Sequence, residues 1–357
     1  MLFEPYALRA LPLKNRAVMS PMTRSRAVDA NTPNALMAEY YGQRAAAGLI
    51  VTEGTSPSPN GLGYPRIPGL YNAAQVKGWK LVTDAVHAKG GKIVLQLMHT
   101  GRVTQAANLP AGAEVVGPGA AVCPGEMYTD AHGMQPHTAP RAMTEADIAH
   151  AAGEFAQSAR LAIEAGFDGV ELHAANGYLI EQFLNANVND RTDGYGGSAS
   201  ARNRFALEVA RATSAAIGAD RVGIRLSPGG VFNATGPYPG MEEQYVALVN
   251  ELSALRLMYL HVLDHSAMGA PPVSAELKLK LRKHFDGPFI LAGGFDHASA
   301  EKALADGQAD LIAFARAFLA NPDLVARMKA GAPLNAPDMS TFYTPGPKGY
   351  TDYPALG

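Results

Sequence analysis

This sequence of 357 residues has one cysteine, little net charge and no long apolar run. A single cysteine, Cys123, excludes an internal disulfide framework. The formal net charge of −2, without long runs of either sign, gives no electrostatic footprint for nucleic acid or an anionic membrane. No apolar run approaches the roughly 20 residues of a membrane span, and residues 1–15 lack the apolar stretch of a signal peptide. We therefore expect a soluble, cytoplasmic protein with small-molecule partners, no nucleic-acid partner and no membrane partner, either a monomer or a homodimer.

What the sequence does contain is a repeated order of helix, glycine and strand. Examples are AAAGLIVTE at 45–53, AIEAGFDGVELH at 162–173 and ALADGQADLIAF at 303–314. Glycine just past a helix end is the expected left-handed cap, and a continuous apolar strand after it is typical of a parallel sheet covered on both faces. The pattern gives eight candidate strands: 17–20, 49–52, 93–97, 169–172, 222–226, 258–262, 289–291 and 311–314. Eight such units predict an α/β fold, a (β/α)8 or TIM barrel, as a single domain over residues 1–357.

A long segment rich in glycine and proline, at about 103–141, interrupts the third unit of this repeat. Structureless segments longer than about 15 residues in compact domains are usually functional or disordered. We interpret this segment as a lid insertion after strand three, and a tolerated surface insertion is the alternative.

Polar residues close several of the predicted strands, where the active site of such a barrel lies. A metal enzyme needs several histidine or carboxylate ligands at these positions, and a Schiff-base aldolase needs a lysine. Neither pattern is present, so we predict no metal. The strand-end residues are Thr23, Glu53, Gly54, Gln96, His173, Arg225, Gly293, Gly294 and Arg316. An amide, a hydroxyl, a histidine and two arginines suit a polar heterocycle that carries a phosphate.

The last two strands carry the signal for the phosphate. Gly293 and Gly294 allow close backbone approach, and Arg316 stands where the last strand opens a helix; loops seven and eight form the common phosphate site of this fold. Arg225 on strand five can place a fixed positive charge beside an electron-accepting ring. A structural ion pair is the alternative for each arginine alone.

The segment HAANGY at 173–178 has the most chemistry. His173 and Asn176 are three residues apart, so a helical turn beginning there would let both side chains donate to one oxygen. Tyr178 follows, and its phenol keeps its proton at neutral pH, ready for a carbanion or enolate.

The chain resembles the Old Yellow Enzyme flavoproteins, in particular the bacterial branch of N-ethylmaleimide reductases and nitrate-ester reductases. The resemblance runs nearly end to end. It rests on SPMTRSRA at 20–27, AEYYGQRA at 38–45, LQLMHTGR at 95–102, ELHAANGYLIEQFL at 171–184, NDRTDGYGGS at 189–198, IRLSP at 224–228, NPDL at 321–324 and GYTDYP at 349–354. It implies an FMN-dependent ene-reductase in which NADH or NADPH reduces FMN, and a hydride then goes to the β carbon of an α,β-unsaturated carbonyl or nitro compound.

The resemblance also implies a role for each matching residue. The catalytic set comprises His173 and Asn176, which bind the activating oxygen of the substrate, and Tyr178, which donates the proton. The cofactor-binding residues are Pro21, Met22, Thr23, Gly54, Gln96, Arg225, Gly293, Gly294, Ala315 and Arg316. The substrate pocket is lined by Tyr64, Met98 and Tyr343.

Two positions depart from the family pattern. Met98 stands where the family usually has tryptophan, and Ala315 stands where a glycine usually precedes the phosphate arginine. Methionine is narrower and more flexible than tryptophan, so we expect a roomier substrate pocket. At position 315 the backbone amide can still bind phosphate, but the added methyl group must fit beside it.

Three other features have more than one reading. The loop at 190–198 is polar, but its Asp-Gly and Gly-Gly pairs are turn chemistry, so we expect a structural role. The tail at 351–354 packs either on its own barrel or on a partner subunit. His99, His261 and His265 lack a shared spacing and a carboxylate companion, which favours core or pocket-wall histidines over a metal site.

Two rival functions remain from the residues alone. A barrel aldolase or isomerase acting on a sugar phosphate explains Arg316, but leaves Gln96 and Thr23 without a task. A flavin-binding redox sensor without a substrate leaves the His-x-x-Asn-x-Tyr pattern unexplained.

Overall fold

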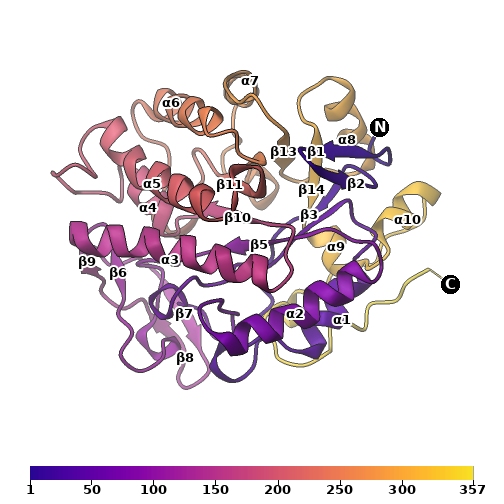
Figure 1. Cartoon of the computed structure of the whole chain (residues 1–357), viewed down its shortest axis with the longest axis horizontal. Coiled ribbons are helices and arrows are strands. Elements are labelled where there is room, and N and C mark those ends of the chain that lie inside the picture. Colours follow the sequence, from indigo (N-terminus) through magenta and orange to yellow (C-terminus); the bar gives the residue numbers. More distant parts are fainter. Residues whose placement is uncertain (357) are drawn as a thin grey trace.

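The computed structural model describes residues 1–356, and in this part of the chain eight parallel strands close into a barrel. The strands follow one another around the barrel in chain order. Figure 1 shows the chain coloured along its sequence, with β3, β5, β10, β11, β13 and β14 labelled. They are β3 (Ala17–Met19), β4 (Leu49–Val51), β5 (Ile93–Leu97), β10 (Gly169–Ala174), β11 (Val222–Leu226), β12 (Tyr259–Leu263), β13 (Phe289–Ala292) and β14 (Leu311–Phe314). The predicted (β/α)8 barrel is confirmed, and each predicted strand lies within two residues of the observed one.

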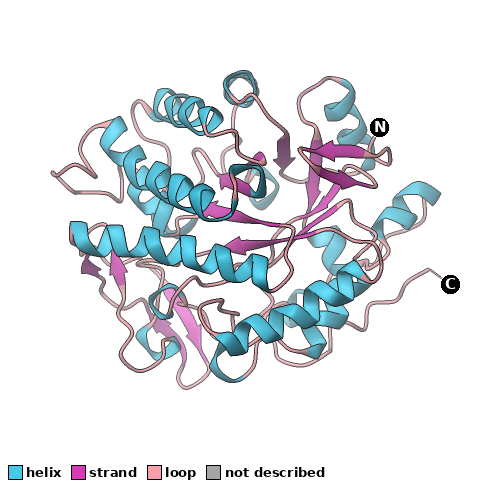
Figure 2. Cartoon of the chain, in the orientation of Figure 1, coloured by secondary structure: helices cyan, strands magenta, loops and turns pink. Residues whose placement is uncertain are grey.

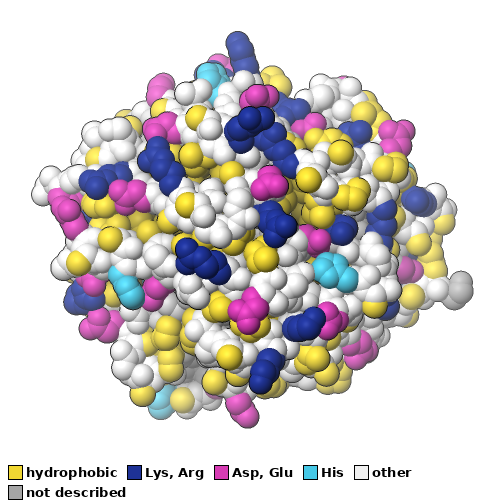
Figure 3. Space-filling view, in the orientation of Figure 1, with side chains coloured by type: hydrophobic (Ala, Val, Ile, Leu, Met, Phe, Trp, Pro, Cys, Tyr) yellow, Lys and Arg dark blue, Asp and Glu magenta, His cyan; other side chains and the backbone are white. Residues whose placement is uncertain are grey.

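Helices pack around the outside of this barrel (Figure 2). The longer ones are α1 (Ala35–Gln43), α2 (Ala73–His87), α3 (Glu145–Glu164), α5 (Ala199–Ile217), α6 (Met241–Ala254), α7 (Ala275–His284) and α8 (His297–Ala305). Three short helices, α4 (Leu179–Leu184), α9 (Arg316–Ala320) and α10 (Leu324–Ala330), follow strands β10 and β14. No helix in residues 1–356 is both long and apolar enough to cross a membrane. The face in Figure 3 carries interspersed acidic and basic side chains.

Helix α3 shows how the sequence sets these boundaries. The Thr144 side chain accepts the Asp147 backbone N–H, and the Asp147 carboxylate accepts the Thr144 N–H, which makes a capping box. At the other end Gly166 has φ +92°, a conformation that side chains disfavour. The chain then enters β10, as the glycine pattern predicted.

A small hairpin of β1 (Tyr6–Leu8) and β2 (Leu11–Leu13) closes the end of the barrel at which the parallel strands begin. Leu8 and Leu13 pack in one buried cluster with side chains from inside the barrel strands. Access to the barrel interior is therefore from the carboxyl ends of the strands.

The insertion after β5 has secondary structure of its own. Strands β7 (Glu126–Thr129) and β8 (Gly133–Pro136) form an antiparallel hairpin. The short strands β6 (Val116–Gly117) and β9 (Arg141–Ala142) pair at its base. The polar loop at 190–198 lies beside this insertion, where the Arg191 guanidinium donates to the backbone carbonyl of Pro118 at 2.8 Å.

The C-terminal tail packs on its own barrel. The Tyr350 ring is fully buried and stacks on Tyr40 at 4.0 Å between centroids. Arg24, also buried, donates to the backbone carbonyls of Phe342 at 3.1 Å and Gly349 at 2.7 Å. These contacts carry residues 342 and 343 to the carboxyl ends of the strands.

Candidate active site

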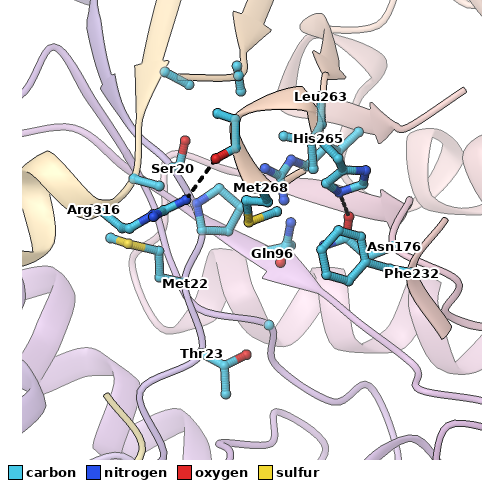
Figure 4. A pocket seen from close by; sticks show the side chains of 18 of the residues that line it. Ser20, Met22, Thr23, Gln96, Asn176, Phe232, Leu263, His265, Met268 and Arg316 are labelled. Carbon is cyan, nitrogen blue, oxygen red and sulfur yellow. Dashed lines mark hydrogen bonds between the residues drawn. The ribbon is translucent and has the colours of Figure 1, made fainter. Parts of the chain in front are cut away.

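A cavity of about 650 Å³ lies at the carboxyl ends of the barrel strands (Figure 4). Every residue that the sequence analysis assigned to catalysis, cofactor or substrate lines it: Pro21, Met22, Thr23, Gly54, Tyr64, Gln96, Met98, His173, Asn176, Tyr178, Arg225, Gly293, Gly294, Ala315, Arg316 and Tyr343. Glu53, a strand-end residue without an assigned role, does not; its carboxylate accepts the Arg24 backbone N–H at 3.2 Å.

Behind Gln96, which lines the cavity, lies a buried carboxylate that the sequence analysis missed. Glu171 on β10 accepts hydrogen bonds from Gln96 Nε2 at 2.8 Å, the Tyr259 hydroxyl at 3.0 Å and His261 Nδ1 at 2.8 Å. Burial raises the pKa of the Glu171 carboxyl, but His261 and Arg225 outweigh this effect and hold the pKa below its usual value. Glu171 is therefore ionised, and because its carboxylate takes the Gln96 N–H, the Gln96 side-chain oxygen remains free as an acceptor. The only sequence signal for Glu171 was its position two residues before His173 on the same strand, which places both side chains on one face.

Arg225 lies beside this carboxylate on the neighbouring strand β11. Burial lowers the pKa of Arg225, while Glu171 opposes the shift. The guanidinium is almost fully buried, and within residues 1–356 its Nε has no hydrogen-bond partner. Buried polar groups are rarely left unpaired, so this donor indicates that a further group belongs in the cavity.

His173 and Asn176 both line the cavity, but they are not joined by the helical turn that the sequence analysis considered. His173 lies on strand β10, and Asn176 and Gly177 have φ values of +61° and +74°. Helix α4 begins only at Leu179. The left-handed turn is held from behind by Glu181, which accepts the Gly177 backbone N–H at 2.6 Å. A strand end followed by a tight turn, rather than a helix face, brings the two side chains together.

His173 is a neutral donor. Its Nδ1 accepts the Ala175 backbone N–H at 3.3 Å, so the proton is on Nε2. Burial, and then the charge of Arg225, lower the pKa of His173 well below its usual value. The ring therefore presents an uncharged N–H at neutral pH.

Tyr178 lies next to His173, with its ring edge-on at 4.9 Å between centroids. Burial raises the pKa of Tyr178 to about 12. Its hydroxyl lies 3.1 Å from that of Tyr64. The phenol is therefore protonated at neutral pH and lies next to the paired donors.

Gly293, Gly294 and Arg316 lie at one end of the cavity. The two glycines have φ values of +146° and +76°, which leaves their backbone bare of side chains. Arg316 is exposed, and its Nη2 lies 3.5 Å from the Ala267 carbonyl. Ala315 has a negative φ of −97°, so its backbone does not need glycine.

Met98 lies between the cavity and the insertion. It is 1% exposed and packs in one cluster with Cys123 and Met127 of the insertion. A Cβ atom on Gly54 would lie 2.4 Å from its sulfur, so glycine at 54 makes room for this side chain.

Loops five and six and the tail supply further lining residues that the strand-end analysis did not assign to the site. They are Phe232, Asn233, His265, Met268 and Phe342. His265 follows the end of β12 by two residues, and the others lie five or more residues beyond their strands, so no alternation pattern marks them. His265 is a pocket-wall histidine, whereas His99 and His261 lie in the core. In the described part of the chain, no group of three or more His, Cys, Asp or Glu side chains could hold a metal ion.

Comparison with known proteins places this cavity in a family. Residues 1–335 match the model of the NADH:flavin oxidoreductase / NADH oxidase family. The chain is 42% identical to 12-oxophytodienoate reductase 7 of Oryza sativa subsp. japonica, over 100% of this chain and 95% of the relative. It is 41% identical to a probable flavin mononucleotide-dependent alkene reductase of Leishmania infantum, over 100% and 98%. The solved structure of the old yellow enzyme homologue from Zymomonas mobilis superimposes with a TM-score of 0.95 at 39% identity, covering 99% of both chains.

Proposed function

The chain belongs to the NADH:flavin oxidoreductase / NADH oxidase family, here the Old Yellow Enzymes, and from this premise we infer that it is an FMN-dependent oxidoreductase that uses NAD(P)H to reduce activated carbon–carbon double bonds. The observation that carries this function is the cavity. Two uncharged N–H donors and a protonated phenol line the same cavity as the Gln96 side-chain oxygen and the Arg225 guanidinium, whose Nε has no hydrogen-bond partner within residues 1–356.

The residues of the cavity fit FMN. The Gln96 oxygen suits an imide N–H, and Arg225 supplies the charged donor whose Nε lacks a partner within residues 1–356. Gly293, Gly294 and Arg316 offer bare backbone and a cation for the phosphate. Pro21, Met22, Thr23, Gly54 and Ala315 are assigned to the remaining FMN contacts because they line the same cavity.

FMN held by these residues would supply the hydride chemistry, since a flavin can accept a hydride from NAD(P)H and pass it to the β carbon of an activated alkene. His173 Nε2–H and the Asn176 amide donate to the activating oxygen of the substrate and stabilise the negative charge that develops there. Tyr178 then gives its hydroxyl proton to the α carbon. Because the His173 and Asn176 donors are uncharged, the oxygen that they bind need not carry a negative charge, which suits a carbonyl or nitro group. Enones, maleimides and nitroalkenes are the proposed substrates, and NADH and NADPH are both proposed as reductants.

The insertion at about 103–141 acts as a lid in this proposal, within a single FMN-binding domain over residues 1–357. Cys123 and Met127 cover Met98 beside the cavity. Asp130 forms an ion pair with Arg66, whose Nη2 donates to the Tyr343 carbonyl at 2.8 Å. The lid, the barrel and the tail thus meet over the proposed substrate site.

The test is the absorbance and turnover of the purified protein. We expect bound FMN, bleaching by NADPH or NADH without air, and recovery on adding an enone, with saturated product formed in equal amount. A colourless protein that takes up no FMN would favour the aldolase. Bleaching without recovery by any of the proposed substrates would favour the redox sensor.

A further inference from the structure

The loop after β12 contributes a buried histidine to which the proposed mechanism gives no task. His265 is 2% exposed and lines the cavity. Its Nε2 lies 2.9 Å from Asn176 Oδ1 (Figure 4). An amide oxygen can only accept, and His265 Nδ1 is buried without a hydrogen-bond partner within residues 1–356. A proton on Nδ1 would therefore be a buried donor without an acceptor, which favours the tautomer in which Nε2 carries the proton and donates it to Asn176.

This hydrogen bond determines which end of the Asn176 amide is free. With Oδ1 taken by His265, the NH2 group is the end left for a ligand in the cavity. The Asn176 backbone is already fixed, because its N–H donates to Ser227 Oγ at 2.9 Å and its carbonyl accepts from Asn233 Nδ2 at 2.7 Å. The side-chain torsions are therefore the remaining freedom. Rotation of the amide by half a turn would present its oxygen, which repels a carbonyl or nitro oxygen.

The surroundings of His265 hold its ring in this orientation. The Phe232 ring packs against it at 4.5 Å between centroids. Gly230 leaves room for it, since a Cβ there would lie 2.9 Å from Nδ1. Burial lowers the pKa of His265 to about 4, and the charge of Arg225 adds to the effect. The imidazole is therefore neutral at pH 7, and its one N–H donates to Asn176 Oδ1.

We propose that His265 is a positioning residue that locks the Asn176 amide with its NH2 group toward the substrate oxygen. The two proposed donors are then set in the same way. The Ala175 N–H occupies the acceptor nitrogen of His173, and the His265 N–H occupies the acceptor oxygen of Asn176. The inference rests on the proposed function, because it needs Asn176 to donate to the ligand.

The experiment measures the affinity of 4-chlorophenol for the FMN-loaded enzyme by titration of the flavin absorbance. The phenol oxygen is the acceptor for both donors. His265→Leu removes the hydrogen bond, and we expect the dissociation constant to rise about 3- to 10-fold, the range of one net hydrogen bond. His265→Gln keeps an N–H donor and should stay within about twofold of the wild type. Ser266→Ala changes the neighbouring exposed residue, which does not line the cavity, and is the matched control.

A double-mutant cycle separates an indirect role from a direct one. If His265 acts through Asn176, His265→Leu will add no further loss of affinity in an Asn176→Ala background. An equal loss in both backgrounds overturns the proposal, because His265 would then touch the ligand itself. An unchanged dissociation constant in His265→Leu, with a weakened one in Asn176→Ala, overturns the inference and leaves the proposed function intact. If Asn176→Ala also leaves the affinity unchanged, Asn176 does not donate to the ligand, and both its proposed role and the inference are wrong.

Discussion

Met98→Trp tests how the cavity wall controls which face of the alkene is reduced. Met98 is 1% exposed, with Gly54 on one side and the lid residues Cys123 and Met127 on the other. The larger indole has no free volume on the lid side, where overpacking costs about 1–3 kcal/mol. Relief therefore comes from turning the ring toward the cavity. There a difference of about 1.4 kcal/mol between two substrate poses changes the product ratio tenfold.

The assay is chiral chromatography of the product from a β-substituted cyclic enone, at equal conversion for each variant. We expect Met98→Trp to alter the enantiomeric ratio and to lower the activity on bulky enones. Met98→Leu, which conserves volume, is the control and should leave the ratio nearly unchanged. An unchanged ratio with Met98→Trp across several prochiral substrates, in a folded and FMN-loaded variant, would refute the reasoning and place Met98 outside the reach of the substrate.

Three further outcomes are expected. Tyr178→Phe should slow reoxidation by an enone about 10²- to 10⁴-fold while NADPH still reduces the flavin normally; stopped-flow traces of the two half-reactions check this, and equal losses in both would remove Tyr178 as proton donor. Burial raises the pKa of Glu181 to about 7, so the folded state keeps a proton that the unfolded chain loses from about pH 4.5 upward. The unfolding free energy of the wild type should accordingly fall relative to Glu181→Gln by roughly 1 kcal/mol per pH unit across that window, and parallel urea-unfolding curves would contradict it. Arg24→Met, which removes the Arg24 donors to the carbonyls of Phe342 and Gly349, should lower the unfolding free energy by about 2–4 kcal/mol. A loss below about 0.5 kcal/mol would mean that other contacts hold the tail.

The barrel could be predicted because local signals repeat along the chain. A glycine such as Gly166 ends a helix, and the buried run after it, such as β10, needs no alternation to be read as a strand of a covered parallel sheet. Chain order then fixes the place of each strand-end residue in the barrel. Apart from Glu53, the strand-end residues therefore line the cavity. The pocket residues Tyr64, Met98 and Tyr343 were assigned through the family resemblance.

The features of the site and of the tail that could not be predicted from the sequence depend on contacts between distant segments. The spacing of His173 and Asn176 fits a helical turn as well as a strand end with a left-handed turn, and the choice rests on Glu181 and Ser227 behind the turn. The same holds for His265, whose task becomes visible only when loop six meets Asn176. The tail could equally have reached a partner, because the buried face of Tyr40 that receives Tyr350 is not marked in the sequence.

Isotope tracing follows the transferred hydride and the transferred proton separately. The enzyme is given NADPH deuterated at the nicotinamide C4 in ordinary water, and then ordinary NADPH in deuterium oxide, with 2-methylcyclohexenone as substrate. We expect deuterium at the β carbon in the first product, after transfer through FMN, and at the α carbon in the second, from the Tyr178 hydroxyl after exchange with solvent. Deuterium at the carbonyl carbon in the first experiment, or reduction without FMN, would contradict the proposed mechanism.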